Sequence, residues 1–217
     1  MQDVFLEHLS PLLVPAVRIL DVGAGRTPAL APADRPAGCY YVGLDVSSQE
    51  LAAADPDAYD QTYEHDIVEP LNELSALDVV VSWQALEHVS SLPRALANLR
   101  QMLRPGGTLL AQLSGSFAAF ALAARVIPHR LRVKAIVRYL GHVEEQKFPT
   151  HYDHCHARAI RKLLNDWEAS ELVSFYRGAP YFSFSRPLQR LYLGYEDFIE
   201  SRSMDNLATH YLIIARA

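Results

Sequence analysis

Short apolar runs that end in an acidic or small polar residue recur along the first half of the chain. Each run is rich in β-branched residues, and Val79, Val80 and Val81 form the centre of one of them. Continuous runs of this kind are typical of parallel strands that are buried on both faces. The pattern predicts strands over residues 17–21, 39–46, 61–67, 77–82 and 108–113.

Helical patterns lie between these predicted strands. Apolar residues recur at helical spacing over residues 2–13, a serine at 47 or 48 caps a second helix, and a third runs from Ser91 to the Arg104-Pro-Gly-Gly107 stop. Residues 26–38 hold three prolines, which predict a short or irregular connection. The alternation predicts an α/β domain with a doubly wound, mostly parallel, Rossmann-like sheet, whose ligands bind at the carboxyl ends of the strands.

The second half of the chain has a different pattern of apolar and charged residues. Residues 115–147 read as a helical lid inserted into a single domain of residues 1–217, with an apolar stretch followed by five Lys or Arg residues. The cations either face water or attract an anionic or lipid-linked substrate, and residues 117–138 are a candidate for peripheral membrane contact. A helix over 156–167, strands over 171–176 and 209–215, and a helical middle of 187–202 complete the prediction.

Composition narrows the class of protein. The 217 residues carry a formal net charge of −5, which argues against a broad nucleic-acid surface. The two cysteines, Cys39 and Cys155, are far apart and in no metal-binding spacing. The first residues lack the basic flank of a signal peptide, and no apolar run is long enough to span a membrane. The expected compartment is the cytoplasm.

Two glycines and a distant carboxylate suggest a nucleotide site. Gly23 and Gly25 directly follow the first strand, where residues without a Cβ let a ligand lie against the main chain. Asp45 ends the second strand about 20 residues further on, where nucleotide-binding α/β sheets place the carboxylate that binds ribose hydroxyls. A cofactor with a ribose is therefore expected here.

Together these segments resemble the class I S-adenosylmethionine-dependent methyltransferases that act on small molecules. The resemblance rests on Ile19-Leu-Asp-Val-Gly-Ala-Gly25, Tyr41-Val-Gly-Leu-Asp45, His65-Asp66, Leu77-Asp-Val-Val-Val-Ser-Trp-Gln-Ala-Leu-Glu-His-Val89 and Leu103-Arg-Pro-Gly-Gly-Thr-Leu109. Gly-Ala-Gly-Arg-Thr-Pro and Phe148-Pro-Thr-His-Tyr152 are similar to members from bacterial polysaccharide and natural-product clusters. The resemblance implies seven strands with a C-terminal antiparallel hairpin.

The resemblance also implies the cofactor, S-adenosylmethionine, and its contacts. Asp21, Gly23 and Gly25 would hold the methionine end, Asp45 the ribose and Asp66 the adenine amino group, while residues 82–84 would line the wall beside the sulfonium. The full expected set is Asp21, Gly23, Ala24, Gly25, Asp45, Val46, Asp66, Ile67, Ser82, Trp83 and Gln84. One departure is that Thr27-Pro28 stands where the family has a third glycine, which puts a close helix approach after this loop in doubt.

Three histidines are candidates for the general base of methyl transfer. A hydroxyl acceptor needs a base with a pKa near the working pH, and His88, His151 and His154 are the candidates. A structural role at a helix start is the alternative for His88, and a polar loop that caps the next helix is the alternative for the histidines after the lid. No metal is expected, because their spacing fits no zinc site and Gln84 stands where relatives with a metal place an acid.

The sequence thus predicts an enzyme that methylates an oxygen, or less readily a nitrogen, of a small molecule, sugar or lipid-linked glycan. A nicotinamide-dependent oxidoreductase is an alternative, although the third glycine of the dinucleotide fingerprint is missing. A non-catalytic module that binds S-adenosylmethionine is another. Nucleic-acid methylation is disfavoured by the charge and by Ser82-Trp-Gln-Ala85, which lacks the Asn-Pro-Pro-aromatic arrangement of base-amine methylating relatives.

Overall fold

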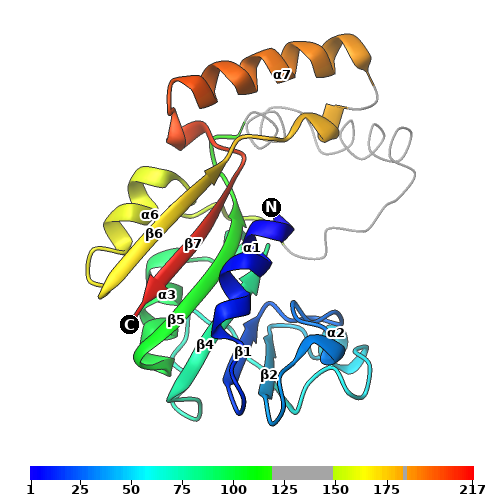
Figure 1. Ribbon diagram of the computed structural model, residues 1–217, viewed down its shortest axis with the longest axis vertical. Coiled ribbons are helices and arrows are strands. Elements are labelled where there is room, and N and C mark those ends of the chain that lie inside the picture. The colour runs from blue at the N-terminus through cyan, green and yellow to red at the C-terminus, as the bar shows by residue number, and fades with distance from the viewer. Residues whose placement is uncertain (119–148, 183–184) are drawn as a thin grey trace.

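A twisted sheet covered on both faces by helices forms the body of the molecule. In the computed structural model, which describes residues 1–118, 149–182 and 185–217, the strand order is β3-β2-β1-β4-β5-β7-β6. Strands β1 to β5 are parallel to their neighbours, and β7 runs antiparallel to both β5 and β6. Figure 1 shows this sheet edge to edge, with β6 (yellow) and β7 (red) at one side and β2 at the other. The predicted fold class, with its closing antiparallel hairpin, is confirmed.

The strands begin close to where the sequence pattern places them. Their bounds are β1 Arg18–Val22, β2 Tyr40–Asp45, β3 Gln61–Glu64, β4 Leu77–Trp83, β5 Leu103–Ser114, β6 Ala169–Phe175 and β7 His210–Arg216. The third strand ends at Glu64, three residues before the end of the predicted range 61–67, because Asp66 accepts a hydrogen bond from Val68 N in a turn (3.1 Å). The fifth strand begins five residues earlier than predicted, since Leu103 already pairs with Leu77 across a register shift.

Helices lie on both faces of the sheet, and one lies beyond its end (Figure 1). Their bounds are α1 Gln2–Leu9, α2 Ser48–Ala52, α3 Leu92–Met102, α6 Ala157–Leu163 and α7 Arg186–Ser201. Helix α1 crosses the face that Figure 1 presents, and α3 and α6 lie behind the sheet. In the part of the chain that the structure describes, no helix is long and apolar enough to cross a membrane.

Several predicted helices differ from the observed ones. The first is shorter than predicted, because a 3-10 turn at Ser10–Leu12 follows Leu9, and α6 ends at Leu163 and not at residue 167. Helix α7 is longer than predicted and fills the whole segment. Ser47 is the residue that caps α2, with Oγ accepting from Glu50 N at 3.2 Å. The predicted lid, residues 115–147, and the candidate membrane stretch, residues 117–138, lie almost entirely outside the described residues.

The α3 N-terminus is capped from a distance. Ser91 stands at the N-cap position, as predicted, but its side chain makes no capping hydrogen bond. Instead, Oδ2 of Asp153 accepts from Leu92 N at 3.0 Å, so a residue after the long insertion satisfies this helix start. The loop of residues 149–156 is thereby fixed to the turn after β4.

The connection after β1 contains no α-helix, as its prolines predict. Between Arg26 and Gly38 the structure has one 3-10 turn, Pro32–Asp34. Side chains from the sheet hold this segment in place: Oδ2 of Asp21 accepts from Ala29 N (2.7 Å) and from the Tyr41 hydroxyl (2.8 Å), and that hydroxyl accepts from Leu30 N (3.1 Å). The Arg35 guanidinium lies 3.9 Å from the Tyr41 ring centroid and donates to Leu30 O. A buried polar network therefore replaces the usual crossover helix.

This network makes stability depend on pH through Asp21. Burial raises the pKa of its carboxyl to about 6, in spite of the two hydrogen bonds that it accepts. Because the folded protein holds the Asp21 proton more tightly than the unfolded chain does, the free energy of unfolding falls as pH rises from about 4 to about 6. Asp21→Asn removes this contribution, so the difference in unfolding free energy between wild type and variant changes by about 3 kcal/mol across the window. Urea denaturation at pH 4, 5, 6 and 7 measures it.

The matched control is Asp34→Asn, because Asp34 is an exposed carboxylate of the same connection. That variant keeps the wild-type dependence of stability on pH. Parallel curves for wild type and Asp21→Asn would contradict the assignment.

Candidate cofactor and active site

A cavity of about 1040 Å³ opens at the carboxyl ends of β1, β2 and β4. Its volume is at the upper end of the range found for small-molecule sites. The cavity is bordered by the glycine turn, the ends of β2 and β3, the turn after β4 and the loop of residues 149–156. Its lining residues are Val22, Gly23, Gly25, Arg26, Thr27, Leu44, Asp45, Val46, Glu50, His65, Asp66, Ile67, Gln84, Ala85, Leu86, His88, Val89, Ser90, Pro149 and His151.

The glycine turn needs residues without a side chain for two different reasons. Gly23 has φ +74°, and a Cβ added there would lie 2.1 Å from the Ala85 Cβ. Gly25 has φ +52°, but its nearest neighbour would be Oδ2 of Asp45 at 3.8 Å. Gly23 N and Ala24 N both donate to Leu44 O, at 2.8 and 3.1 Å. The turn is thus pressed against the end of β2 and against the turn after β4.

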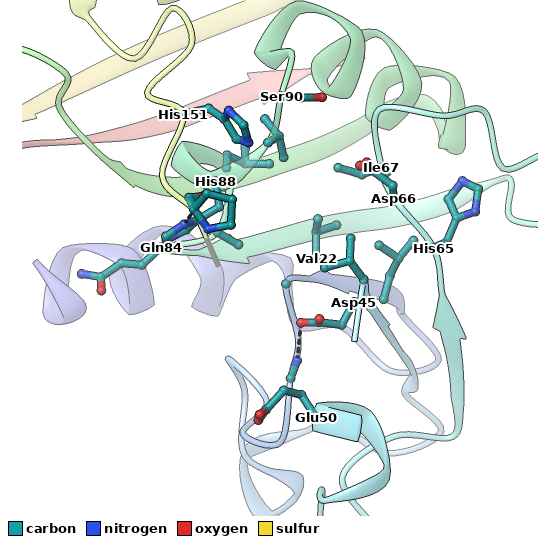
Figure 2. A pocket seen from close by; sticks show the side chains of 18 of the residues that line it. Val22, Asp45, Glu50, His65, Asp66, Ile67, Gln84, His88, Ser90 and His151 are labelled. Atoms are coloured by element: carbon teal, nitrogen blue, oxygen red, sulfur yellow. Dashed lines mark hydrogen bonds between the residues drawn. The ribbon is translucent and has the colours of Figure 1, made fainter. Parts of the chain in front are cut away.

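Asp45 is buried at the end of β2 and uses both of its oxygens. Oδ2 accepts from Gly25 N at 3.0 Å, and Oδ1 accepts from Ser47 N at 2.9 Å. Figure 2 shows the first of these bonds as a dashed line, with Asp45 directed into the cavity. Each carboxylate oxygen has a second lone pair, so Asp45 can accept two further hydrogen bonds, as the vicinal hydroxyls of a ribose require.

The predicted adenine contacts border the same half of the cavity. Val46, Asp66 and Ile67 all line it, and Asp66 uses Oδ1 to accept from Val68 N. This leaves Oδ2 as the second acceptor of the Asp66 carboxylate. The side chains therefore fit the ribose and adenine of S-adenosylmethionine, and the glycine turn fits its methionine end.

The other end of the cavity is formed by the turn after β4 and the loop of residues 149–156. Figure 2 shows His88 and His151 together at this end, well apart from Asp45. Nδ1 of His88 lies 3.1 Å from Pro149 O. Because a carbonyl only accepts, the neutral ring carries its proton on Nδ1 and keeps Nε2 as its basic nitrogen.

Glu87 connects the three segments of this end. Its main-chain oxygen accepts from His151 N (3.1 Å) and Tyr152 N (3.0 Å), and its buried carboxylate accepts from Ser114 N through Oε1 (3.2 Å). Burial raises the pKa of the Glu87 carboxyl. Glu87 thus holds His151 over the cavity although its own side chain does not line it.

The turn that carries His88 starts with an unusual backbone conformation. Gln84 has φ +53°, a region that costs about 1 kcal/mol for a residue with a side chain. Its N–H donates to Gln112 O at 2.8 Å, and its side chain points away from the other labelled residues in Figure 2. The backbone of Gln84, more than its side chain, therefore shapes the cavity wall.

The structure does not bring every predicted site residue to the cavity. The Asp21 carboxylate is engaged by Ala29 and Tyr41, and Ser82 Oγ donates to Val22 O at 2.9 Å. Trp83 packs edge to face on Phe5, with ring centroids 5.0 Å apart, on the α1 side of the sheet. Ala24, like these three, is not a lining residue.

His154 is also outside the cavity. Its Nδ1 lies 2.7 Å from Oδ1 of Asp153, on an exposed part of the loop. Of the three base candidates, His88 and His151 line the cavity and His154 does not. Within the described ranges, no group of three or more His, Cys, Asp or Glu side chains is arranged to hold a metal ion.

Sequence reasoning missed several lining residues. Arg26 and Glu50 form a two-point ion pair at 2.7 and 2.9 Å across the mouth of the glycine turn. His65 and Ser90 also border the cavity. The signal for Arg26 and Glu50 is weak, because they are 24 residues apart and their pairing depends on α2 folding back over the turn.

A buried carboxylate after β2, a glycine turn after β1 and an elongated cavity define a nucleoside-binding site on a doubly wound sheet. The pattern of the Methyltransferase domain family matches residues 3–169, and the chain belongs to this family. The fold is that of the class I methyltransferases, and the prediction of S-adenosylmethionine as the cofactor is confirmed.

Two comparisons with individual proteins agree. Ubiquinone biosynthesis O-methyltransferases of Rhodopseudomonas palustris (strain BisB5) and Maricaulis maris (strain MCS10) are 30% and 31% identical over 112 and 114 residues. These matches span 49% of this chain and 44% of the length of each relative. A SAM dependent methyltransferase from Archaeoglobus fulgidus superposes with a TM-score of 0.60 at 16% identity, over 100% of this chain and 95% of that one.

A structure that carries the cofactor has the same fold. Phosphoethanolamine N-methyltransferase 2 of Haemonchus contortus in complex with S-adenosyl-L-methionine has a TM-score of 0.61 at 15% identity, and the match covers 99% of this chain and 52% of that one.

Substitution of the two glycines by alanine is expected to lower the unfolding free energy by different amounts. Gly23→Ala forces Cβ into Ala85 and strains a positive φ, so we expect a loss of about 3 kcal/mol or more in unfolding free energy. Gly25→Ala meets only the conformational strain, about 1 kcal/mol. Urea denaturation of both variants tests this order. Equal losses would mean that the close approach of Gly23 to Ala85 is relieved at little cost.

Proposed function

We propose that this protein transfers the methyl group of S-adenosylmethionine to a hydroxyl oxygen of a small molecule. The observation that carries the proposal is the shape of the cavity, in which Asp45 and His88 stand at opposite ends. The names of the ubiquinone biosynthesis relatives support an oxygen as the acceptor atom. Within this proposal the acceptor is a free small molecule, a sugar or a lipid-linked glycan.

Each part of the cavity has a task in this proposal. The bound cofactor supplies an activated methyl group. Asp45 holds the ribose, Val46, Asp66 and Ile67 hold the adenine, and the glycine turn receives the methionine end. This fixes the orientation of the methyl group toward the His88 end, and such positioning accounts for a large part of the rate in group-transfer reactions.

His88 is the proposed general base. Its Nε2 keeps a lone pair because Nδ1 faces Pro149 O, and an imidazole of this kind can take the proton of an acceptor hydroxyl. His151 is the second candidate, since Glu87 holds its main chain at the same end. His154 would act only after a movement of its loop.

Two other functions make different demands on the site. A nicotinamide-dependent oxidoreductase needs room for a pyrophosphate beside the glycine turn, where Arg26, Thr27 and Glu50 stand. A non-catalytic module needs no base at the far end, where His88 and His151 gather. The observed lining therefore favours methyl transfer over both.

Calorimetric titration of the purified protein tests the cofactor. We expect micromolar binding of S-adenosylmethionine and S-adenosylhomocysteine and none of NAD. Asp45→Ala removes a buried carboxylate that two hydroxyls need, so affinity falls by a factor of about 10 to 100. The matched control is Glu64→Ala, because Glu64 pairs with Asp45 in register but is exposed.

Binding of NAD without S-adenosylmethionine would favour the oxidoreductase. A wild-type affinity in Asp45→Ala would show that ribose recognition lies elsewhere. Thermal melting of each variant separates loss of the ligand from loss of the fold.

Histidine variants test the base. With radiolabelled S-adenosylmethionine and a panel of phenols, catechols and methyl glycosides, we expect His88→Ala to lower kcat about 100-fold while cofactor affinity is kept. His151→Ala has a smaller effect, and His154→Ala, the matched control, leaves kcat unchanged because His154 is outside the cavity. A wild-type kcat in both His88→Ala and His151→Ala would mean that neither histidine takes the proton.

A further inference from the structure

A buried amide lies at the carboxyl end of the sheet, on the face opposite the predicted base. Along β5 the side chains of Leu110, Gln112 and Ser114 point to the α1 face, because alternate residues of a strand share a face and Leu110 packs with Phe5 and Leu9 of α1. Gln112 stands beside Trp83 of β4 and Leu212 of β7.

Gln112 is enclosed without hydrogen bonds to its side chain. The residue is 1% exposed, and in the part of the chain that the structure describes neither Nε2 nor Oε1 has a partner. A buried amide without partners loses the hydrogen bonds that it makes to water in the unfolded chain, which costs free energy comparable to a lost hydrogen bond for each group. Leu110, two residues earlier on the same face of β5, and Leu212, the partner of Gln112 on β7, are both buried in the apolar core. An apolar side chain would therefore suit position 112 as well.

The strand neighbours of Gln112 are apolar. They are Trp83 of β4, whose ring packs on Phe5, and Leu212 of β7. His210, two pairs further along β7, is buried, and burial together with the positive N-terminal amino group lowers its pKa to about 4, so its ring is uncharged at neutral pH.

Gln112 is also tied to the wall of the cofactor cavity. Its main-chain oxygen accepts from Gln84 N at 2.8 Å, and Gln84 is the lining residue with the positive φ. The main chain of Gln112 is therefore joined directly to the turn past which the methyl group of the cofactor is expected to point.

We infer that Gln112 is a specificity-determining residue that binds an uncharged group of the methyl acceptor. Its amide has both donors and an acceptor, so it pairs with a group that has both, such as a hydroxyl or a carboxamide. This inference rests on the proposed function.

Substitution by leucine distinguishes recognition from a structural role. If the amide is kept for a ligand, Gln112→Leu removes an unpaired polar group and raises the Tm by about 2–6 °C. If the amide is a structural element, the same change lowers the Tm. Gln189→Leu is the matched control, because the half-buried Gln189 donates to Ala179 O at 3.3 Å and its replacement does not raise the Tm.

Turnover provides the second measurement. With any phenol, catechol or methyl glycoside that the wild type methylates, Gln112→Leu raises the KM for that probe about tenfold, while the affinity for S-adenosylhomocysteine is unchanged. A lower Tm, or an unchanged KM, overturns the inference. Failure of the wild type to bind S-adenosylhomocysteine would instead contradict the proposed function, which calorimetry on wild type alone decides.

Discussion

The two hydrogen bonds that Asp45 accepts hold together the parts of this molecule that face the cofactor. One comes from the turn after β1 and the other from the start of α2, so a single buried carboxylate fixes both loops at one edge of the sheet. The same geometry leaves lone pairs directed into the cavity. Structural and binding roles therefore coincide in Asp45, and the position of the adenosine half follows from them.

Much of the fold could be predicted from the sequence, because strands buried on both faces have a recognisable composition. The errors fall where tertiary contacts decide. β5 begins five residues early because Leu103 pairs across the sheet, and α7 extends through its whole segment although its N-cap residue, Ser185, makes no capping hydrogen bond. The α3 cap is the clearest case. Ser91 is the local candidate, yet Asp153, 61 residues away from Leu92, makes the bond. Short-range patterns cannot reveal such a partner.

Only part of the candidate site could be predicted from the sequence. Asp45 and Asp66 line the cavity as expected, whereas Asp21, which the sequence pattern does not distinguish from them, faces the connection after β1. The difference lies in the direction of the side chain. A carboxylate near the end of a strand can point past the end of the sheet into the cavity, or it can point to one face of the sheet, as Asp21 does. The Trp83 side chain also lies on a face of the sheet, the one that α1 covers, and packs on Phe5. Arg26 and Glu50 could not be paired from the sequence because their contact depends on how α2 docks.

The connection after β1 also affects how this region folds. A crossover helix forms from contacts between residues three or four apart, and its shape is established locally. Here Leu30 is held by Tyr41, and Arg35 donates to Ala58 O at 2.6 Å, 23 residues further along the chain. These contacts exist only after β1 and β2 have paired. We therefore expect the segment that begins at the glycine turn to become ordered late in folding, together with the sheet that holds it.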